Sequence, residues 1–367
     1  MGKFYTLDDI KKKNAQYNII FGERSNGKTS AVLEEILVNY CKKGEYGAVI
    51  RRYDEDFKNK RANQLWESIA NERELVSKYT NGEWTGITYR SHMWYFTKFN
   101  ALLNRTIRAE NPFCFAFSLT GSEREKGSSY SKITTVLFDE FLTREAYLVN
   151  EFVSFTSVLS TIIRHRNNVK IYMCGNTVNK YCPYFDEMGL KNVRKMNPGD
   201  LDVYNYGTSG LRVAVHYADT AIQNGGKKSD VYFAFDNPKL DMITKGSWEL
   251  PVYPHAPYKL SGYQVIYMFF IVMDDTILQG DIYNVDGNTF AFIHRKTTDI
   301  KGNYPIYTLG FTVNRRQYIS LTRGVDKVSS KIADLFVRQK VFYQDNDVGD
   351  TVRNYIQMSN KFNIQNL

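Results

Sequence analysis

A glycine-rich octapeptide near the start of the sequence has the residue types and spacing of a phosphate-binding loop. It fits the pattern G-x-x-x-x-G-K-[ST], and it lies between a short apolar run at residues 17–21 and a helical pattern at residues 28–40. Backbone N–H groups of such a loop bind phosphate oxygens, and the following helix adds the positive end of its dipole. The nucleotide-binding residues expected from this pattern are Gly22, Glu23, Arg24, Ser25, Asn26, Gly27, Lys28, Thr29 and Ser30.

An acidic pair, Asp139-Glu140, directly follows a β-branched apolar run at residues 133–138. Beside a phosphate-binding loop, Asp139 and Thr29 are expected to hold Mg²⁺, and Lys28 to reach the β- and γ-phosphates. Glu140 is placed to polarise the attacking water as a general base. By itself the pair would be an ordinary solvated strand end. With the loop, it predicts ATP hydrolysis and argues against small GTPases and most kinases, which lack the adjacent glutamate.

Arg164 and Arg166 follow a helix expected at residues 146–163. A cation here could act as an arginine finger on the γ-phosphate in a neighbouring subunit, because phosphoryl transfer spreads negative charge over the transferring oxygens. An ordinary basic helix end, which is favourable to the helix dipole, is an equal alternative.

Four further polar residues are candidates of lower specificity. Asn176, at the end of a strand at residues 169–174, could position the attacking water or be a plain turn residue. Arg51 and Arg52 end a strand at residues 46–50 and could face the nucleotide, DNA or solvent. Lys126, in a Ser/Gly-rich loop, could face a central pore or a neighbouring site, and its contacts with a DNA backbone would weaken with salt.

The elements that must position these groups alternate between strand and helix over the first ~195 residues, which predicts a mostly parallel sheet covered by helices. A hairpin is expected near residues 81–89 and helical structure at residues 54–79. Glycines and prolines then mark a linker or lid with some strands. Three strand-like runs and two helices, at residues 328–342 and 348–358, end the chain. The predicted domains are residues 1–197, a linker at 198–262 and an α+β domain at 263–367.

Composition narrows the function classes only mildly. The net charge of +9 fits a polyanionic partner but is weak support for one. Four cysteines without a CxxC pair indicate a reduced intracellular chain, and the five histidines form no metal-binding pattern. The longest apolar run, residues 265–273, is too short to span a bilayer, so we expect no membrane partner.

Several of these strings together resemble the genome-packaging ATPases of small phi-29-like tailed phages. The resemblance covers residues 15–190 in order and spacing and is faint after residue 200. It is carried by Phe21-Gly22-x-x-x-x-Gly27-Lys28, Ile50-Arg51-Arg52-Tyr53, Thr135-Val136-Leu137-Phe138-Asp139-Glu140-Phe141, Ile163-Arg164-x-Arg166, Asn176 and Pro183-Tyr184-Phe185.

This resemblance implies a RecA-like P-loop ATPase of the additional-strand, catalytic-glutamate division. It implies a homomeric ring, typically a pentamer, that moves double-stranded DNA in the host cytoplasm while docked on the portal (connector) of an empty capsid, and that is absent from the mature virion. In part of the family a structural RNA bridges motor and capsid. The family's trans finger falls on Arg164, with Arg166 as its neighbour, the lysine of the Ser/Gly loop falls on Lys126, and the sensor-like position falls on Asn176.

The family's C-terminal domain resembles a ribonuclease-H-type nuclease without its catalytic acids, which implies a DNA- or capsid-binding role. The first strand expected there carries no acid in its interior, although Asp274, Asp275 and Asp281 are nearby. Two alternatives stay open: a terminase-like packaging enzyme with a working nuclease, and another ring DNA translocase. A scaffold that only binds nucleotide is a third, disfavoured because a mere binder does not need Glu140.

Overall fold

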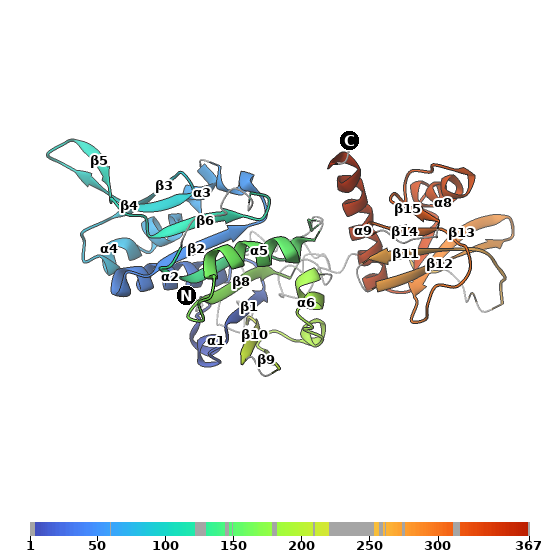
Figure 1. Cartoon of the computed structure of the whole chain (residues 1–367), viewed down its shortest axis with the longest axis horizontal. Helices are drawn as coiled ribbons and strands as arrows, with labels where there is room; N and C mark the ends of the chain where they lie inside the picture. Colours follow the sequence, from blue (N-terminus) through green and yellow to red (C-terminus); the bar gives the residue numbers. More distant parts are fainter. Residues whose placement is uncertain are drawn as a thin grey trace, which may run out of the picture. The chain divides into compact units, whose positions relative to one another are not determined.

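The chain divides into two compact units, each built on its own sheet (Figure 1). The first unit holds strands β1 to β10 and the second holds β11 to β16. The computed structural model describes residues 4–58, 60–121, 130–143, 147–148, 150–177, 182–207, 210–219, 253–256, 260, 262–273, 276–310 and 316–365.

The helices of the first unit include one long helix on each face of its sheet. They are α1 (Asp8–Lys12), α2 (Lys28–Lys43), η1 (Asp54–Phe57), α3 (Lys60–Gln64), the π-helical turn η2 (Ser68–Glu72), α4 (Leu75–Tyr79), α5 (Glu151–Ile163), α6 (Pro183–Glu187) and η4 (Val193–Lys195). The strands are β1 (Tyr17–Gly22), β2 (Tyr46–Arg51), β3 (Gly86–Arg90), β4 (Met93–Asn100), β5 (Arg105–Arg108), β6 (Cys114–Ser118), β7 (Ile133–Asp139), β8 (Lys170–Asn176), β9 (Leu201–Tyr206) and β10 (Leu211–Tyr217).

The sheet has the order β3-β4-β6-β2-β7-β8-β1-β10-β9, with β5 paired to β4. Strands β6, β2, β7, β8, β1 and β10 are mutually parallel, and antiparallel strands extend the sheet at both edges. Because β8 lies between β1 and β7, the expected additional-strand P-loop fold is confirmed. The boundary expected at residue 197 differs, since β9 and β10 continue this sheet to Tyr217.

Strand β7 is buried along its whole length, so side chains on both of its faces must be covered. Leu137 packs in the core cluster that contains the apolar side of α2. Phe138 points the other way, and its ring stacks on that of Phe155 in α5 with the centroids 5.0 Å apart. Because successive strand residues alternate between faces, α2 and α5 cover opposite sides of the sheet.

The expected hairpin near residues 81–89 lies further along the chain. Strands β3 and β4 are joined by a two-residue turn at Ser91 and His92, whose φ angles are 51° and 58°. Positive φ at both central residues is the type I′ geometry that matches strand twist. The helical stretch expected at residues 54–79 is real but is broken into η1, α3, η2 and α4.

The second unit contains β11 (Val265–Met273), β12 (Thr276–Val285), β13 (Asn288–Arg295), β14 (Ile306–Thr308), β15 (Gln317–Tyr318), β16 (Val341–Tyr343), α8 (Lys327–Val337) and α9 (Asn346–Gln365). Its sheet order is β15-β14-β11-β12-β13-β16. Strands β11 to β13 form the expected antiparallel meander, and β14 pairs in parallel with β11. This is the α+β arrangement expected of a ribonuclease-H-type fold.

The helix expected at residues 328–342 is shorter than predicted. Helix α8 ends at Val337, and the apolar pair Val341-Phe342 belongs to β16, which pairs in parallel with β13. Among the helices of the described segments, none is long and apolar enough to cross a membrane.

Candidate functional site

The glycine-rich loop connects β1 to α2 at the carboxyl end of the parallel strands. Gly22 and Gly27 have φ angles of 151° and 91°, which L-residues rarely adopt. A Cβ on Gly22 would lie 3.1 Å from the carbonyl oxygen of Ala218, and one on Gly27 would lie 3.2 Å from Phe4. The glycines are therefore required by their backbone angles, and a Cβ at either position would also be crowded. Gly27 also caps the N-terminus of α2 without a side chain, which leaves that helix end open to an anion.

Lys28 is buried and its ammonium group is held by the loop itself. Nζ donates to the carbonyl oxygen of Glu23 at 2.6 Å, to Oδ1 of Asn26 at 3.1 Å and to Oδ1 of Asn176 at 3.4 Å. Burial lowers the pKa of Lys28 to about 8. The lysine therefore sits in a desolvated position where an incoming phosphate would stabilise its charged form.

The carboxylate of Asp139 joins the loop to the end of β2. Its Oδ1 accepts a hydrogen bond from Oγ1 of Thr29 at 2.7 Å, and its Oδ2 pairs with Nη2 of Arg51 at 2.5 Å. Burial alone would lower the pKa of Arg51, but the charges of Asp139 and Glu140 raise it on balance. A hydroxyl and a carboxylate oxygen side by side form the hard-oxygen donor set that suits Mg²⁺.

Glu140 is exposed and has a left-handed backbone, with φ at 59°. Although the side chain is open to solvent, desolvation by the surrounding protein and the charge of Asp139 raise its pKa. The buried guanidinium of Arg52 fixes this turn by donating to the carbonyl oxygens of Glu140 at 3.2 Å and Phe141 at 2.9 Å. It also pairs with both carboxylate oxygens of Glu151 at the start of α5, each at 2.8 Å.

These groups surround one cavity of about 350 Å³, which lies within the usual range for small-molecule sites. Two residues that line it carry a buried donor with no hydrogen-bond partner among the described residues, Nδ2 of Asn26 and Nε of Arg51. Unpaired buried donors, an open helix N-terminus and the Thr29–Asp139 pair all fit a Mg²⁺–nucleotide. The lining residues are Ser25, Asn26, Gly27, Lys28, Thr29, Ser30, Arg51, Gln64, Leu65, Asp139, Glu140, Cys174, Gly175 and Asn176.

Most of the residues predicted for nucleotide binding therefore meet in one place. Gly22 and Glu23 contribute carbonyl oxygens that hold Lys28. Arg24 is exposed and does not line the cavity. Asn176 reaches it because β8 lies directly beside β1, where Gly22 and Asn176 are register partners.

The structure separates the alternatives that the sequence left open for Arg51 and Arg52, and it changes the assignment of Arg166. Arg51 and Arg52 do not face a DNA-binding surface, because one pairs with Asp139 in the cavity and the other is buried against Glu151. Arg166 is not available as a trans-acting group, because its guanidinium donates to backbone carbonyls of its own chain. Those carbonyls belong to Tyr130, Ser131, Ile133, Ile162 and Ile163.

Arg164 and Lys126 are the other two candidates for contacts with a neighbouring subunit. Arg164 is exposed at the C-terminal end of α5, with a positive φ of 48°. Lys126 lies outside the described residues.

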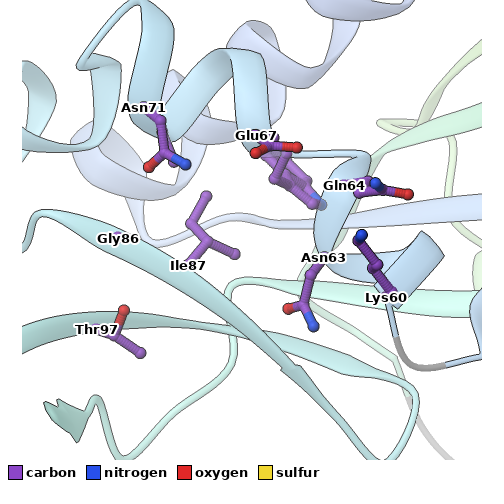
Figure 2. A pocket seen from close by; sticks show the side chains of 10 residues that line it. Lys60, Asn63, Gln64, Glu67, Asn71, Gly86, Ile87 and Thr97 are labelled. Carbon is purple, nitrogen blue, oxygen red and sulfur yellow. The ribbon is translucent and has the colours of Figure 1, made fainter.

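Sequence reasoning missed the part of the cavity wall that comes from the last residue of α3 and the residue after it. Gln64 and Leu65 line the cavity, and Gln64 also lines a second cavity of about 600 Å³ between this helical segment and the β3–β4 hairpin. Figure 2 shows Gln64, Glu67 and Asn71 on the helical side of this second cavity and Ile87 and Thr97 on its strand side. No motif in residues 54–79 points to this wall, because its residues are common surface types.

In the second unit, Asp281 is the described member of the acids considered for a nuclease site. Its carboxylate accepts from Nε2 of Gln279 at 2.8 Å and pairs with Nε2 of His294 at 3.0 Å. Asp274 and Asp275 lie outside the described residues. Across the described part of both units, no three His, Cys, Asp or Glu side chains group closely enough to hold a metal ion.

Proteins similar to this chain in sequence include DNA packaging proteins of Bacillus phages. The sequence is 25% identical over 176 residues to the DNA packaging protein of Bacillus phage B103, covering 47% of this chain and 48% of that protein. The chain thus spans about half the length of the packaging proteins that it matches in sequence.

Two solved structures share the fold of almost the whole chain. The Phi-28 gp11 DNA packaging motor aligns with a TM-score of 0.57 and 14% identity over 98% of both chains. The bacteriophage Phi-29 viral genome packaging motor assembly aligns with a TM-score of 0.57 and 15% identity over 97% of this chain and 99% of that one. The family model of the podovirus DNA encapsidation protein (Gp16) matches residues 1–205, more than half of the chain, which therefore belongs to this family.

Proposed function

We propose that this protein is a Mg²⁺-dependent ATPase that works as a ring of identical copies and drives double-stranded viral DNA into a preformed capsid. The observation that carries the proposal is the convergence of Lys28, Thr29, Asp139 and Glu140 on one cavity. Family membership and the DNA packaging relatives support the choice of DNA as the moved polymer.

The residues of the cleft have distinct tasks in this proposal. The loop from Ser25 to Ser30 binds the phosphates, and Lys28 exchanges its contact with the carbonyl of Glu23 for phosphate oxygens. Thr29 and Asp139 would hold Mg²⁺, and Arg51, which pairs with Asp139, would then share or release that carboxylate. When bound, Mg²⁺ supplies charge neutralisation at the β- and γ-phosphates.

Glu140 is the proposed general base. Its raised pKa makes the carboxylate a better proton acceptor, and its exposed position at the cavity leaves room for a water molecule. Arg52 is a positioning residue, because it holds the backbone on which Glu140 sits and ties it to α5.

Arg164 is proposed to act on the cleft of a neighbouring copy. Helix α5 starts beside the cleft, where Glu151 meets Arg52, and ends near the beginning of β7, where Arg166 meets Ile133. Its 13 residues span about 20 Å at 1.5 Å per residue, so Arg164 lies far from its own cleft. Its exposure and unusual backbone angle suit a contact made between subunits.

The proposed setting is the host cytoplasm, on the portal vertex of the procapsid. Loss of the γ-phosphate would release a contact shared by two subunits, and the resulting change in ring geometry would move bound DNA. We assign DNA or capsid binding to the C-terminal unit and a subunit or pore contact to Lys126. A pentameric ring and a bridging structural RNA are part of the same proposal.

The test is steady-state ATP hydrolysis by the wild type and Glu140→Gln, with and without double-stranded DNA. Turnover that is stimulated by DNA, and that Glu140→Gln abolishes while ATP binding is retained, supports the proposal. If isolated chains show no turnover, procapsids are added. Absence of hydrolysis there as well refutes ATPase function and leaves a scaffold that only binds nucleotide.

A further inference from the structure

A two-stranded ribbon projects from one edge of the sheet of the first unit (Figure 1). Strand β4 pairs with β6 only at Met93 and Trp94, and with β3 only as far as Thr97. Beyond that point its only strand partner among the described residues is β5, through the pairs from Thr97–Arg108 to Asn100–Arg105. Four residues per strand make an arm about 13 Å long at 3.3 Å per residue.

The tip of this ribbon is apolar and open to solvent. Leu102 is 98% exposed, Leu103 is 54% exposed and Phe99, just below them, is 63% exposed. An isolated two-stranded ribbon is at best marginally stable, and these side chains contribute nothing to the core. Apolar side chains this exposed at the end of a projecting element are available for contact with another molecule.

The paired strands of the ribbon are basic. Residues 93–108 contain no Asp or Glu and bear Lys98, Arg105 and Arg108, while Glu83 and Glu110 lie just outside the hairpin. The register places Lys98 and Arg105 on one face and Arg108 on the other, because paired and alternate residues share a face. Lys98 lies 4.8 Å over the ring of Trp84 and Arg108 4.1 Å over that of Tyr95, so two of the cations are pre-positioned.

We propose that this ribbon is a contact surface for double-stranded DNA and enters the major groove tip first. The proposal rests on the packaging function proposed above and specifies an element that contacts the DNA. The major groove is about 12 Å wide and admits a two-stranded ribbon, whose strands lie about 4.8 Å apart.

The side chains of the ribbon match both the phosphate walls and the base-edge floor of the major groove. Cations on both faces reach the phosphates of both groove walls, and the leucine tip contacts base edges and thymine methyl groups on the floor. Duplex RNA is a poorer fit because its major groove is deep and narrow. A protein partner would need an apolar pocket ringed by carboxylates, and it is an alternative that the experiment separates.

The test measures the affinity of the full chain for a short DNA duplex by fluorescence anisotropy over a series of salt concentrations. The variant Arg105→Gln/Arg108→Gln should lower the slope of log affinity against log salt by about 2, and the affinity near 0.1 M salt by at least about tenfold. The matched control is Lys42→Gln/Lys43→Gln, which removes two exposed cations at the end of α2 and should leave the slope unchanged.

A second variant, Leu102→Ser/Leu103→Ser, should weaken DNA binding several-fold without changing the slope, because it removes no charge. All ribbon variants should keep the far-ultraviolet circular dichroism spectrum and the DNA-independent ATP turnover of the wild type, because these side chains lie outside the core and the nucleotide cleft.

The outcomes separate this proposal from the proposed function. If the wild type binds DNA and both ribbon variants bind it equally well, the ribbon proposal alone is wrong. Tighter binding of duplex RNA than of duplex DNA through the ribbon, or loss of a capsid-protein contact with DNA binding intact, also overturns it. If the wild type binds no DNA while it hydrolyses ATP, both proposals fail.

Discussion

Two buried carboxylates, one in each unit, show how the surroundings decide what an acid can do. Asp139 and Asp281 are 5% and 7% exposed, and each is paired with a cationic or titratable side chain. Asp139 ends a parallel strand, lines a cavity and shares it with the open N-terminus of α2. Asp281 lies inside an antiparallel strand, where Gln279 and His294 are register partners of each other and both bond to it.

The difference lies in which contacts a ligand can replace. At Asp139, the contacts with Thr29 and Arg51 lie beside a cavity whose lining residues include buried donors without a partner among the described residues, so an entering Mg²⁺–nucleotide can replace contacts with new bonds. At Asp281, the carboxylate is already satisfied by side chains of its own sheet. The first arrangement is suited to binding and chemistry, and the second to holding strands together.

The largest expected effect comes from neutralising Asp139, with the same change at Asp281 as the control. Asp139→Asn should reduce ATP turnover by about 10³-fold or more, because a preorganised charge at the phosphates is lost, and should weaken Mg²⁺-dependent nucleotide binding. Asp281→Asn, the matched control, should leave both unchanged. Turnover and nucleotide titrations on the two variants measure this, and equal losses in both would break the comparison.

The buried pair Arg52–Glu151 should give the next largest effect. Arg52→Met removes the guanidinium and leaves the carboxylate of Glu151 buried without its cationic partner. This change should lower the free energy of unfolding by about 3 kcal/mol or more. It should also lower turnover, because the turn at Glu140 loses a donor.

A double-mutant cycle in denaturant gives the control. The double variant Arg52→Met/Glu151→Leu should recover part of the lost stability, because no unpaired charge remains. Simple additivity of the two single changes would mean that the pair contributes no coupling.

Much of the nucleotide cleft could be predicted from the sequence because its chemistry is local. The glycine spacing around Lys28 predicts the phosphate-binding loop on one side of the cavity. The acidic pair Asp139-Glu140 after an apolar strand predicts the opposite side. The sheet then brings the two together, since parallel strands share their carboxyl edge. The same reasoning placed Asn176 at that edge.

What could not be predicted depends on contacts distant in sequence. The difference between Arg51 and Arg52 follows from strand alternation and from the position of Glu151 on α5, which no motif records. The β3–β4 turn was misplaced because Ser91-His92 is not a usual type I′ sequence. Val341-Phe342 continues a helical pattern, but pairing with β13 outweighs that local preference.

A smaller effect is expected in the pH dependence of nucleotide binding. Burial lowers the pKa of Lys28 to about 8, and bound phosphates would favour the ammonium form and raise this pKa. Affinity for ATP should therefore fall as the pH rises above about 8, by up to about tenfold per pH unit, with proton uptake on binding. Isothermal titration in buffers of different ionisation enthalpy measures both. Lys28→Met should remove the pH dependence, and a persistent dependence in that variant would assign it to another group.

The smallest expected effect is a pH dependence of stability in the second unit, through the pair His294–Asp281. The hydrogen bond to Asp281 raises the pKa of His294 above its ordinary value of 6.5. The folded state therefore binds this proton more tightly than the unfolded state, so the contribution to stability is full below pH 6.5 and is lost as the pH rises through the folded pKa. Because His294 is partly exposed, the contribution should stay below about 1 kcal/mol. Urea unfolding of the wild type and His294→Gln over this pH range should show a flatter pH dependence in the variant and identical ATP turnover. A change in turnover would mean that Asp281 and His294 do more than hold β12 to β13.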